Sequence, residues 1–440
     1  MKLSFQNLAF RDKGNCIEII LLKLFYFEIP RQDLQKMGDF KIEANSIEFR
    51  GRGKDNENKK EDTAGKFNFL LARYMSYPHL KCILNDNTAT YINKNSGIPL
   101  MGNLSFGIVD RGSDIIEIKP ATGCNMGCIF CSVDEGRSTG KVHEFVVEEE
   151  YIIEELKKII EFKCKMQSGK MPDGFEIYIN PHGEPLLYAD IVQLVEDLHK
   201  IRQIKNIAIV TNGTLLNEKL ADDLAQAGLG QLSISISASE NDAAKQIMNA
   251  KSYDAEKLKR MIRYIQKKYK DKIKLILTPV WISGINDLQI EKLIEFAKEL
   301  NCEIKIQNFL RHDRGRKPKG AKEILFDEFY AKLKELETRY EIRLSFENEL
   351  AVGKTEELGM PFAKGDAVKA EIVCPGRYKS QCIGIAGEKA YSAGKKNLNN
   401  PDNSKRSILI QNCDFAGKKN KIVKVRILKA KNNLFVGEVI

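Results

Sequence analysis

Three cysteines in one short stretch have the spacing to hold an inorganic centre. Cys124, Cys128 and Cys131 form the pattern C-x3-C-x2-C within GCNMGCIFCS. A structural zinc site takes four protein ligands, and a cubic iron–sulfur cluster also takes four. The stretch supplies three, and the next cysteine, Cys164, lies beyond a predicted helix. Two interpretations are open: a cluster with one free position for a substrate or cofactor, or thiols that are merely reduced or belong to part of a zinc site.

Strands and helices alternate around this stretch and predict how it is positioned. Helical patterns occupy about 145–164, 189–203, 216–227, 253–269 and 287–300, with a further one at 326–341. Runs of strand length lie at Ile115–Lys119, Phe175–Ile179, Ile207–Thr211, Leu232–Ser237, Ile273–Val280 and Glu303–Gln307. This alternation predicts an α/β fold of parallel units, in which six strands form an open, partial (βα)6 barrel. The active site of such a barrel lies at the carboxyl ends of the strands, and the cysteines follow the first strand.

Polar segments follow the next strands and are candidates for the same site. Glu184, between Gly183 and Pro185, follows the second strand and can accept a hydrogen bond from an ammonium group. Thr211 and Asn212 follow the third strand in a turn that continues with Gly213. Each segment alone is an ordinary turn, so their shared position at strand ends is what favours a functional role.

The fourth and fifth strands add further polar candidates. Ser235 and Ser237 share one face of an alternating strand, where inward hydroxyls are costly unless they have a partner. Neighbouring backbone groups are the alternative partner. Asn286 follows the fifth strand, and Asp287 is placed to cap the next helix. The only tryptophan, Trp281, is expected to pack in the core, with stacking on a base as the alternative.

Together with Phe130, these motifs resemble the radical S-adenosylmethionine (SAM) superfamily over roughly residues 110–310. The resemblance implies one 4Fe–4S cluster on Cys124, Cys128 and Cys131, with SAM on the open iron. It also implies reductive cleavage of SAM by an external electron donor such as a ferredoxin or flavodoxin. The resulting 5′-deoxyadenosyl radical then removes a hydrogen atom from the substrate. Catalytic residues beyond the cluster stay unassigned, and the implied cofactor contacts are Phe130, Gly183, Glu184, Pro185, Thr211, Asn212, Ser235, Ser237 and Asn286.

The C-terminal segment differs in pattern and in charge. From residue 372 onward it has 14 Lys and Arg against 4 Asp and Glu, which equals the net charge of +10 of the whole chain. A second basic run, RHDRGRKPKGAK, spans 311–322. Such density is typical of nucleic-acid binding, although a solvated lysine-rich surface is the alternative. The short apolar alternations Ala370–Val373, Cys382–Ile385, Ile408–Ile410, Ile422–Leu428 and Leu434–Ile440 predict a small all-β, OB-like barrel.

The ending GKKNKIVKVRILKAKNNLFVGEVI resembles the TRAM domain, a small RNA-binding module. The resemblance implies RNA, tRNA first, as a partner bound through 367–440 and 311–322, with Tyr378, Tyr391 and Phe435 as stacking candidates. Methylthiotransferases with such a domain carry three further N-terminal cysteines, but the N-terminal region here has only Cys16 and Cys82. Their reaction is therefore not carried over. We expect Cys374, Cys382 and Cys413 to be buried thiols; a second cluster on them is the alternative.

The rest of the chain sets the domain organisation. We expect 1–63 to be an N-terminal extension, 64–366 the radical SAM core and 367–440 the RNA-binding domain. Residues 1–36 show neither a helical nor a strand pattern, which suggests that the protein starts at Met37, with an extra strand or helix on the core as the alternative. Residues 51–63 read as a flexible loop. A helix near Phe67–Met75 and a hairpin near Cys82–Ile92 lead into the core.

Composition limits the function classes. The 440 residues are 43% hydrophobic and 30% charged, as in soluble globular proteins, and no apolar run reaches the length of a membrane span. The ten cysteines form no regular framework, so a reducing, cytoplasmic setting is expected, with an archaeal or thermophile-like character. The leading hypothesis is a radical SAM enzyme that modifies RNA. The alternatives are a radical SAM maturase that acts on a peptide or small molecule, and an RNA-binding module with a structural cluster.

Overall fold

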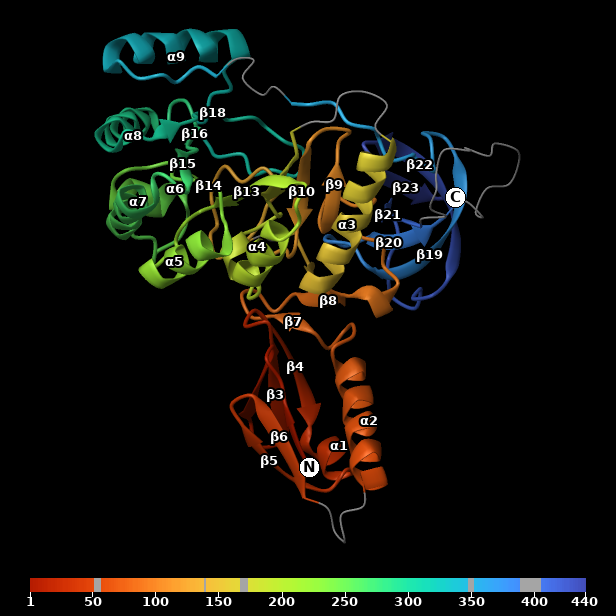
Figure 1. Cartoon of the computed structure of the whole chain (residues 1–440). Coiled ribbons are helices and arrows are strands. Elements are labelled where there is room, and N and C mark those ends of the chain that lie inside the picture. The colour runs from red at the N-terminus through yellow and green to blue at the C-terminus, as the bar shows by residue number, and fades with distance from the viewer. Residues whose placement is uncertain (51–56, 138–139, 167–172, 347–351, 388–404) are drawn as a thin grey trace.

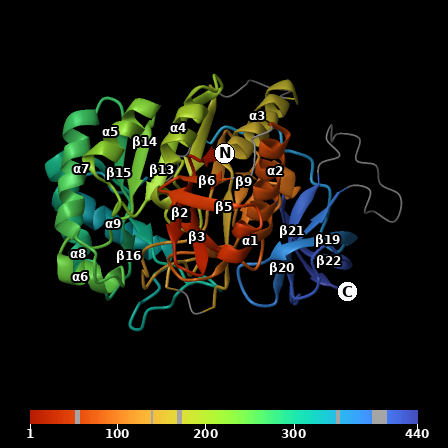
Figure 2. The same cartoon turned by 90° about the horizontal axis from the view of Figure 1, so that it is seen from below.

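The computed structural model describes residues 1–50, 57–137, 140–166, 173–346, 352–387 and 405–440, and it has three parts (Figure 1). A large α/β core lies in the middle of the chain and of the molecule. A narrow N-terminal lobe extends from one side of it, and a β-barrel formed by the C-terminal residues packs at one end of its sheet (Figure 2). The described helices include none that is long and apolar enough to cross a membrane.

The core sheet has seven strands in the order β17-β15-β14-β13-β12-β10-β9. The six from β10 onward pair in parallel and in chain order, so their carboxyl ends lie along one edge. The first two strands have the predicted bounds, the third begins three residues earlier than predicted, and the fourth, fifth and sixth each end three residues earlier. The strands are β9 (Gly107–Asp110), β10 (Ile115–Lys119), β12 (Phe175–Ile179), β13 (Ile204–Thr211), β14 (Gln231–Ile234), β15 (Lys274–Leu277) and β17 (Glu303–Ile304). Strands β16 (Val280–Trp281) and β18 (Gln307–Asn308) form a separate pair. Parallel units are thus confirmed, while the partial (βα)6 layout stays a prediction.

The core helices follow the predicted ranges closely, because local caps define their ends. Asn217 accepts from Leu220 N at 2.9 Å and Asp254 from Lys257 N at 2.9 Å, at the starts of two helices. The helices are α3 (Glu149–Met166), α4 (Ile191–His199), α5 (Glu218–Ala227), α6 (Asn241–Ile247), α7 (Ala255–Tyr269), α8 (Asp287–Leu300) and α9 (Phe326–Tyr340). Helix α6 was not predicted. The predicted helix from 145 was wrong at its start, because His143–Val147 form the fully buried strand β11.

The N-terminal lobe corrects two sequence expectations. Residues 1–36, which lack a clear pattern, form β1 (Lys2–Ser4), β2 (Leu8–Asp12), β3 (Cys16–Leu21), β4 (Phe25–Pro30) and α1 (Arg31–Gln35). The expected loop at 51–63 is helical from residue 57, in α2 (Glu57–Tyr74), and 51–56 lie outside the described residues. Buried apolar side chains of β3, β4 and α2 explain why these residues form regular secondary structure: Ile17, Phe25, Phe27 and Phe67 are each 0% exposed. The start at Met37 stays a prediction.

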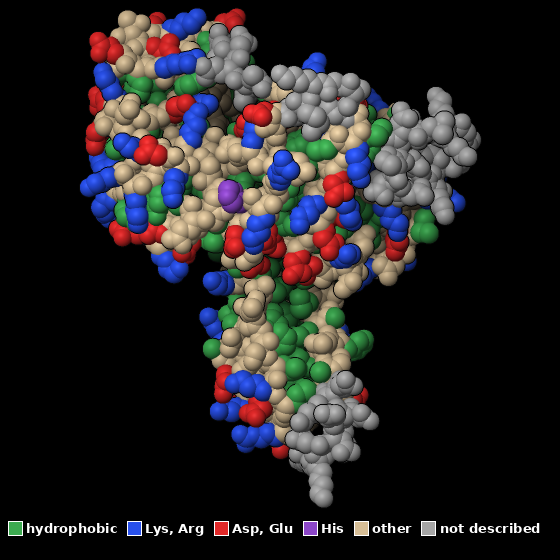
Figure 3. Space-filling view, viewed as in Figure 1, with side chains coloured by type: hydrophobic (Ala, Val, Ile, Leu, Met, Phe, Trp, Pro, Cys, Tyr) green, Lys and Arg blue, Asp and Glu red, His purple; other side chains and the backbone are tan. Residues whose placement is uncertain are grey.

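The lobe is joined to the core through shared strands. Strands β5 (Asp39–Glu43) and β6 (Ser46–Arg50) form a three-stranded sheet with β1, in the order β1-β6-β5, and the expected hairpin is formed by β7 (Lys81–Cys82) and β8 (Thr88–Ile92). A six-stranded sheet in the order β11-β8-β7-β4-β3-β2 connects this hairpin to the lobe and to β11 of the core. Charges of both signs intersperse over the core face seen in Figure 3, whereas hydrophobic side chains gather on the lobe.

The C-terminal strands close into a five-stranded barrel, as predicted. They are β19 (Ala367–Pro375), β20 (Gln381–Ala386), β21 (Arg406–Gln411), β22 (Ile422–Lys431) and β23 (Leu434–Val439), in the order β19-β20-β21-β23-β22. The β21–β23 pair is parallel and the other described pairs are antiparallel. The barrel has its own apolar core, which includes Val368, Ile410 and Phe435.

Candidate active site

The three cysteines lie together at the carboxyl edge of the core sheet, in the loop after β10. Cys124, Cys128 and Cys131 line one cavity of about 440 Å³. The C-terminal end of α6 holds this loop, since Gly127 N donates to Met248 O at 3.0 Å. A parallel (βα) sheet places its strand ends along one rim, so distant segments of the chain meet around this cavity. The location predicted from sequence is therefore the one observed.

A close backbone contact fixes the cysteine loop to the segment after β12. Gly183 forms an isolated parallel bridge with Gly123, and Glu184 N donates to Gly123 O at 2.9 Å. Gly183 has φ +145°, and a Cβ atom there would stand 2.1 Å from Gly123 O. Only glycine allows this approach. The Gly-Glu-Pro segment thus sets the position of the first cysteine as well as that of Glu184.

The donor set fits an iron–sulfur cluster better than a single metal ion. Among the described residues, no three His, Cys, Asp or Glu side chains stand close enough to hold one ion. A structural zinc ion takes four protein ligands, whereas a cubic cluster binds each of the three thiolates through a different iron and leaves the fourth iron open. Burial, and next the neighbouring Cys131, raises the pKa of Cys128 to about 12, and burial likewise raises that of Cys124. Such thiols ionise when a positively charged metal centre binds them.

Backbone amides already point at two of these sulfur atoms. Met126 N donates to Cys124 Sγ at 3.4 Å, and Glu135 N donates to Cys131 Sγ at 3.3 Å. The amide of Asn212 reaches Cys124 Sγ at 3.9 Å. Hydrogen bonds to cluster sulfurs are one of the features that set a cluster's reduction potential. Two of these donors belong to the loop itself, and the third comes from the turn after β13.

Among the residues that the structure describes, Glu184 is one of two buried carboxylates that line the cavity, the other being Glu135. Glu184 is 4% exposed, and its carboxylate accepts from Thr211 Oγ1, from Asn212 N at 2.8 Å and from Leu186 N at 3.0 Å. Burial nevertheless raises the pKa of Glu184 to about 7, since these bonds only partly offset desolvation. A carboxylate has room for about four hydrogen bonds, so one more donor can be accepted. A bound ammonium would favour the charged form.

The turn after β13 links Glu184 to the cysteine loop. Asn212 Nδ2 donates to Asn125 Oδ1 at 2.9 Å, and Asn125 Nδ2 donates to Thr214 Oγ1 at 2.9 Å. Thr211 and Asn212 both line the cavity beside Glu184. The turn that sequence analysis found ordinary by itself is therefore part of the wall of the site.

Six of the nine predicted cofactor contacts line the cavity, and three do not. The six are Phe130, Gly183, Glu184, Thr211, Asn212 and Ser235. Pro185 begins a short 3-10 turn behind the wall. Ser237 Oγ accepts from Val280 N at 3.1 Å, and Asn286 Nδ2 donates to Ser237 O at 2.9 Å and to Val280 O at 2.8 Å, so both connect the backbone after β14 to β16. Trp281 packs against Phe329 and donates to Asp287 at 2.8 Å, as the packing alternative expected.

Arg316 is a residue of the site that sequence analysis did not single out within the basic run. Its guanidinium donates to Cys128 O at 2.9 Å and pairs with Asp134 at 2.8 Å, and Arg316 N donates to Cys131 O at 2.9 Å. The side chain is only 18% exposed. The run was predicted as a nucleic-acid surface, but this arginine is used within the protein. The sequence signal for a role of this arginine in the site was its position beside Gly315, after the last strand of the core.

We expect Arg316→Ala to make the cluster labile. The variant loses three hydrogen bonds of a charged donor to the cysteine loop, to Cys128 O, Asp134 and Glu135 O, each of which contributes about 1.5–3 kcal/mol. Release of iron to a chelator should then accelerate by at least roughly tenfold. The measurement is the anaerobic decay of cluster absorbance with excess chelator. Arg311→Ala is the matched control, because Arg311 is exposed and pairs with Glu323; equal decay in both variants would contradict this role.

A loop of the barrel also holds the cysteine segment. Arg377, between β19 and β20, donates to Val133 O at 2.9 Å and to Glu135 at 2.6 Å. Glu135 in turn pairs with Lys141, which pairs with Glu144 at 2.7 Å, so two buried cations face two buried carboxylates. Arg377 also donates to His182 Nδ1 at 3.1 Å. Burial, reinforced by Arg377, lowers the pKa of His182 far below its usual value, so the ring is neutral.

The stacking candidates and the remaining cysteines are found mostly in packed positions. Tyr378 donates to Val133 O at 3.3 Å under Arg314, Phe435 is 1% exposed, and Tyr391 lies outside the described residues. Cys374, Cys382 and Cys413 are buried free thiols. Cys382 donates to Cys413 O at 2.9 Å, and the described residues place no metal-binding group with them.

Comparisons with known proteins bear on this site. The sequence model of the family described as "Radical SAM superfamily" matches residues 118–297. The uncharacterized protein MJ0103 of Methanocaldococcus jannaschii is 31% identical over 98% of this chain and 96% of its own length. The GTP 3′,8-cyclase of Nautilia profundicola is 30% identical over 47% of this chain. The chain spans only 59% of that relative.

Solved structures give weaker likenesses. A structure of TYW1 with a lysine–pyruvate adduct bound is 22% identical, with a TM-score of 0.38, over 55% of this chain and 80% of that one. Streptococcus suis SuiB bound to S-adenosylmethionine is 15% identical, with a TM-score of 0.39, over 78% of this chain and 72% of that one.

Proposed function

Because this chain belongs to the radical SAM superfamily, whose enzymes use a 4Fe–4S cluster and S-adenosylmethionine, we propose that it is a radical SAM enzyme that modifies RNA, with tRNA as its first candidate substrate. One observation carries the choice of RNA: a basic barrel packs directly on the loop that bears the cysteines. Val142 N donates to Arg377 O at 2.8 Å, and the segment from 372 has 14 cations against 4 anions. Phosphate contacts supply most of the affinity in RNA binding, and OB-like barrels are common platforms for it.

The residues around the cavity have separate roles in this proposal. Cys124, Cys128 and Cys131 bind the cluster, which when bound supplies the electron for reductive cleavage of S-adenosylmethionine. Glu184 accepts a hydrogen bond from the amino group of S-adenosylmethionine, and Thr211 orients that carboxylate. Ser235 lines the wall on the side of the fourth strand and binds the ribose. The wall at the strand ends, with Glu184, Thr211 and Asn212, is buried and limits the access of water from that side.

The barrel and the basic run act together in this assignment. The barrel, of TRAM type, binds the RNA backbone. The exposed cations of 311–322 add to the positive electrostatic potential that attracts the phosphates. Arg316 and Arg311 are engaged within the protein, which leaves Arg314, Lys317, Lys319 and Lys322 of that run for phosphate. A ferredoxin or flavodoxin supplies the electron.

A second candidate is a reaction on a free nucleotide or another small molecule. The matched relatives named GTP 3′,8-cyclase favour it, since their name specifies a nucleotide. They match only the core, however, and this chain spans less than two thirds of their length. A reaction on a free nucleotide gives the basic barrel no polymer to bind.

Nucleoside mass spectrometry tests the proposal directly. Digested RNA from a strain lacking the gene should lack one modified nucleoside that the parent contains. Wild-type protein should restore it, and the Cys131→Ala variant should not. Identical nucleoside profiles in the parent and the deletion strain would overturn the RNA assignment.

A further inference from the structure

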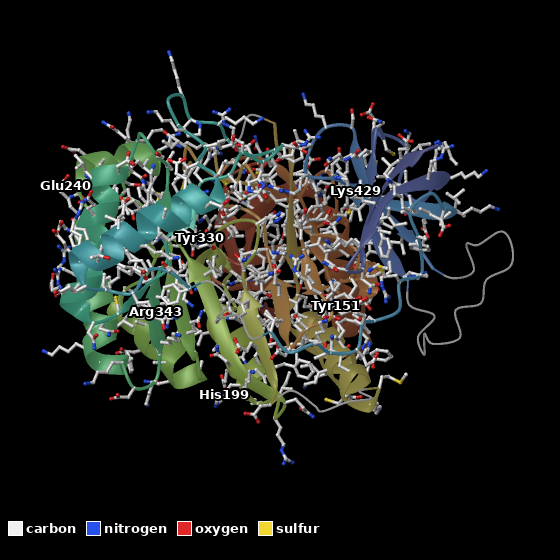
Figure 4. All side chains as sticks on the ribbon, turned by 90° about the horizontal axis from the view of Figure 1, so that it is seen from above. Tyr151, His199, Glu240, Tyr330, Arg343 and Lys429 are labelled. Atoms are coloured by element: carbon white, nitrogen blue, oxygen red, sulfur yellow. The ribbon has the colours of Figure 1, made fainter. Side chains whose placement is uncertain are left out.

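A second cavity lies between the barrel and the core. Its volume is about 520 Å³, within the range of small-molecule sites. It shares Ser132 and Val133 with the cysteine cavity, so the two are neighbours on either side of the segment that follows Cys131. Figure 4 labels Lys429 of β22 on the barrel, at its border with the core. The cavity is separate from the predicted cofactor contacts, none of which lines it.

The walls of this cavity carry positive charge and, among the described residues that line it, no carboxylate. The cations are Arg111, Arg314, Arg377, Lys429 and Lys431. Arg111 is paired with Glu117 at 2.8 Å and Arg377 with Glu135. Lys429 and Lys431 are exposed and have no ion pair within the part of the chain that the structure describes. The remaining wall is largely apolar, with Ile383, Leu409 and Phe435. An occupant should therefore be anionic at one end and flat and apolar at the other.

Two buried donors on the wall lack a partner. Asn103 is 3% exposed and Arg377 7% exposed, and both line the cavity. Asn103 Oδ1 accepts from Ser105 N at 2.7 Å, but Asn103 Nδ2 and Arg377 Nε have no acceptor within the described structure. An unpaired buried donor costs about 1–3 kcal/mol, so such groups call for an explanation. Both are donors, which selects a ligand rich in acceptor oxygens.

Backbone hydrogen bonds hold the two sides of the cavity together. Ser407 N donates to Met101 O at 2.9 Å, and Phe435 N donates to Gly102 O at 3.0 Å. A Cβ atom on Gly102 would stand 2.0 Å from Ser407 O, so only glycine permits this contact. The cavity is thus a feature of a fixed barrel–core contact and has a defined shape before any ligand binds.

We propose that this cavity binds one nucleotide of the substrate, with its phosphate on Lys429, Lys431 and Arg377 and its base against the apolar wall. The proposal rests on the proposed function, because it takes the nucleotide to be the one delivered to the neighbouring cysteine cavity. A nucleotide within RNA and a free nucleotide share this chemistry. Asn103 donates to an oxygen of the same nucleotide.

The test compares two pairs of lysine and arginine changes on one strand. Lys429→Ala/Lys431→Ala removes the cavity cations, and Lys424→Ala/Arg426→Ala removes two exposed cations of β22 that do not line the cavity. The probes are a 5′-phosphorylated single-stranded RNA hexamer and the four nucleoside 5′-monophosphates, each titrated into the cluster-loaded full-length protein. The cavity pair should lower the affinity for the preferred probe by roughly tenfold or more, and the control pair should lower it by less than about twofold. The slope of the logarithm of hexamer affinity against the logarithm of salt concentration should become shallower by about one to two in the cavity pair. The control pair should keep the wild-type slope.

Asn103→Asp is a second variant with nearly the same shape. It keeps the oxygen that accepts from Ser105 N but replaces the unpaired donor with a carboxylate oxygen. A phosphate-bearing ligand should bind roughly tenfold more weakly to it. This change does not alter the surface charge of the barrel strand, so it separates binding in the cavity from general attraction to a basic surface.

The outcomes distinguish the two proposals. Binding of both probes, weakened in the cavity pair and in Asn103→Asp, supports the inference. Monophosphate binding that is weakened by these changes, without hexamer binding, supports the cavity and overturns the RNA assignment. Hexamer binding that falls equally in the two pairs overturns the cavity while the RNA assignment stands. No binding of either probe overturns the cavity.

Discussion

Cys128→Ala should lower the iron content from about four atoms per chain to background and abolish the reductive cleavage of S-adenosylmethionine. In the proposed site three thiolates hold the cluster, and removal of any one of them leaves too few ligands for a stable centre. Cys128 lies in the middle of the loop, with Sγ 3.4 Å from Met248 Sδ, and among the described residues only Cys124 and Cys131 bring a further thiol to the cavity. The measurements are iron and sulfide analysis after anaerobic reconstitution and chromatography of released 5′-deoxyadenosine.

Cys164→Ala is the matched control for this prediction. Cys164 lies on α3, partly exposed and outside the cavity, so its loss should leave iron content and cleavage unchanged. The iron count of the wild-type protein also tests whether the barrel thiols bind a second cluster, since about eight irons per chain would indicate one. Cleavage that survives Cys128→Ala would contradict the assignment of the site.

Glu184→Gln should weaken binding of S-adenosylmethionine by about ten- to a hundredfold. A hydrogen bond between a carboxylate and an ammonium contributes about 1.5–3 kcal/mol, and glutamine retains the shape but loses the charge. Thr211, Leu186 and Asn212 all donate to this carboxylate, which holds it in one orientation. Equilibrium binding to the cluster-loaded protein is the measurement.

The same carboxylate should make binding depend on pH. Burial raises the pKa of Glu184 to about 7, so the free protein favours the protonated form below that pH. An ammonium ligand needs the charged form, and binding therefore releases a proton below pH 7. Affinity should fall by up to about tenfold per unit as the pH drops from 7 to 5, and should change little above 7. Without the ligand the sign is opposite, because a raised carboxyl pKa means that this group's contribution to folding stability is lost as the pH rises from its unfolded value toward 7.

Glu149→Gln is the control for both effects. Burial, followed by nearby Asp197, raises the pKa of Glu149 to about 7 as well, but Glu149 lies at the start of α3 and does not line the cavity. This variant should keep the wild-type affinity and its pH dependence. Equal affinity of Glu184→Gln and wild type, with the same fall below pH 7, would contradict the proposed role.

The sequence predicted the parts of the fold that local patterns encode. The first two parallel strands were placed at their observed bounds, because their apolar residues alternate over a short run that turn signals flank. The start of the helix at 145 was wrong because the apolar run at 145–147 fits a helix as well as a strand, and only the pairing of His143–Val147 with β8 makes it a strand. The strands within residues 1–36 were not predicted because polar side chains that the lobe exposes interrupt the alternation of apolar and polar residues.

The residues of the site that lie in short local motifs were predictable from the sequence. Those that reach the site from distant parts of the sequence were not. Cys124, Glu184 and Asn212 lie in compact strand-end segments, so their convergence followed from the parallel sheet. Arg316 and Arg377 reach the same loop from 188 and 244 residues away, and no periodicity encodes such contacts. Ser237 has the same residue type and strand face as Ser235, yet its hydroxyl is used by Val280 N, which depends on the position of the next strand.

The two long-range arginine contacts have a consequence for biosynthesis. Val133 and its partner Arg377 are separated by 244 residues, which a ribosome translates in about ten to fifty seconds. Throughout that interval the cysteine loop exists without Arg377, and for most of it without Arg316. We therefore expect the metal centre to be inserted late, after the barrel has emerged and packed on the core. Nascent chains stalled before residue 377 should accept iron poorly.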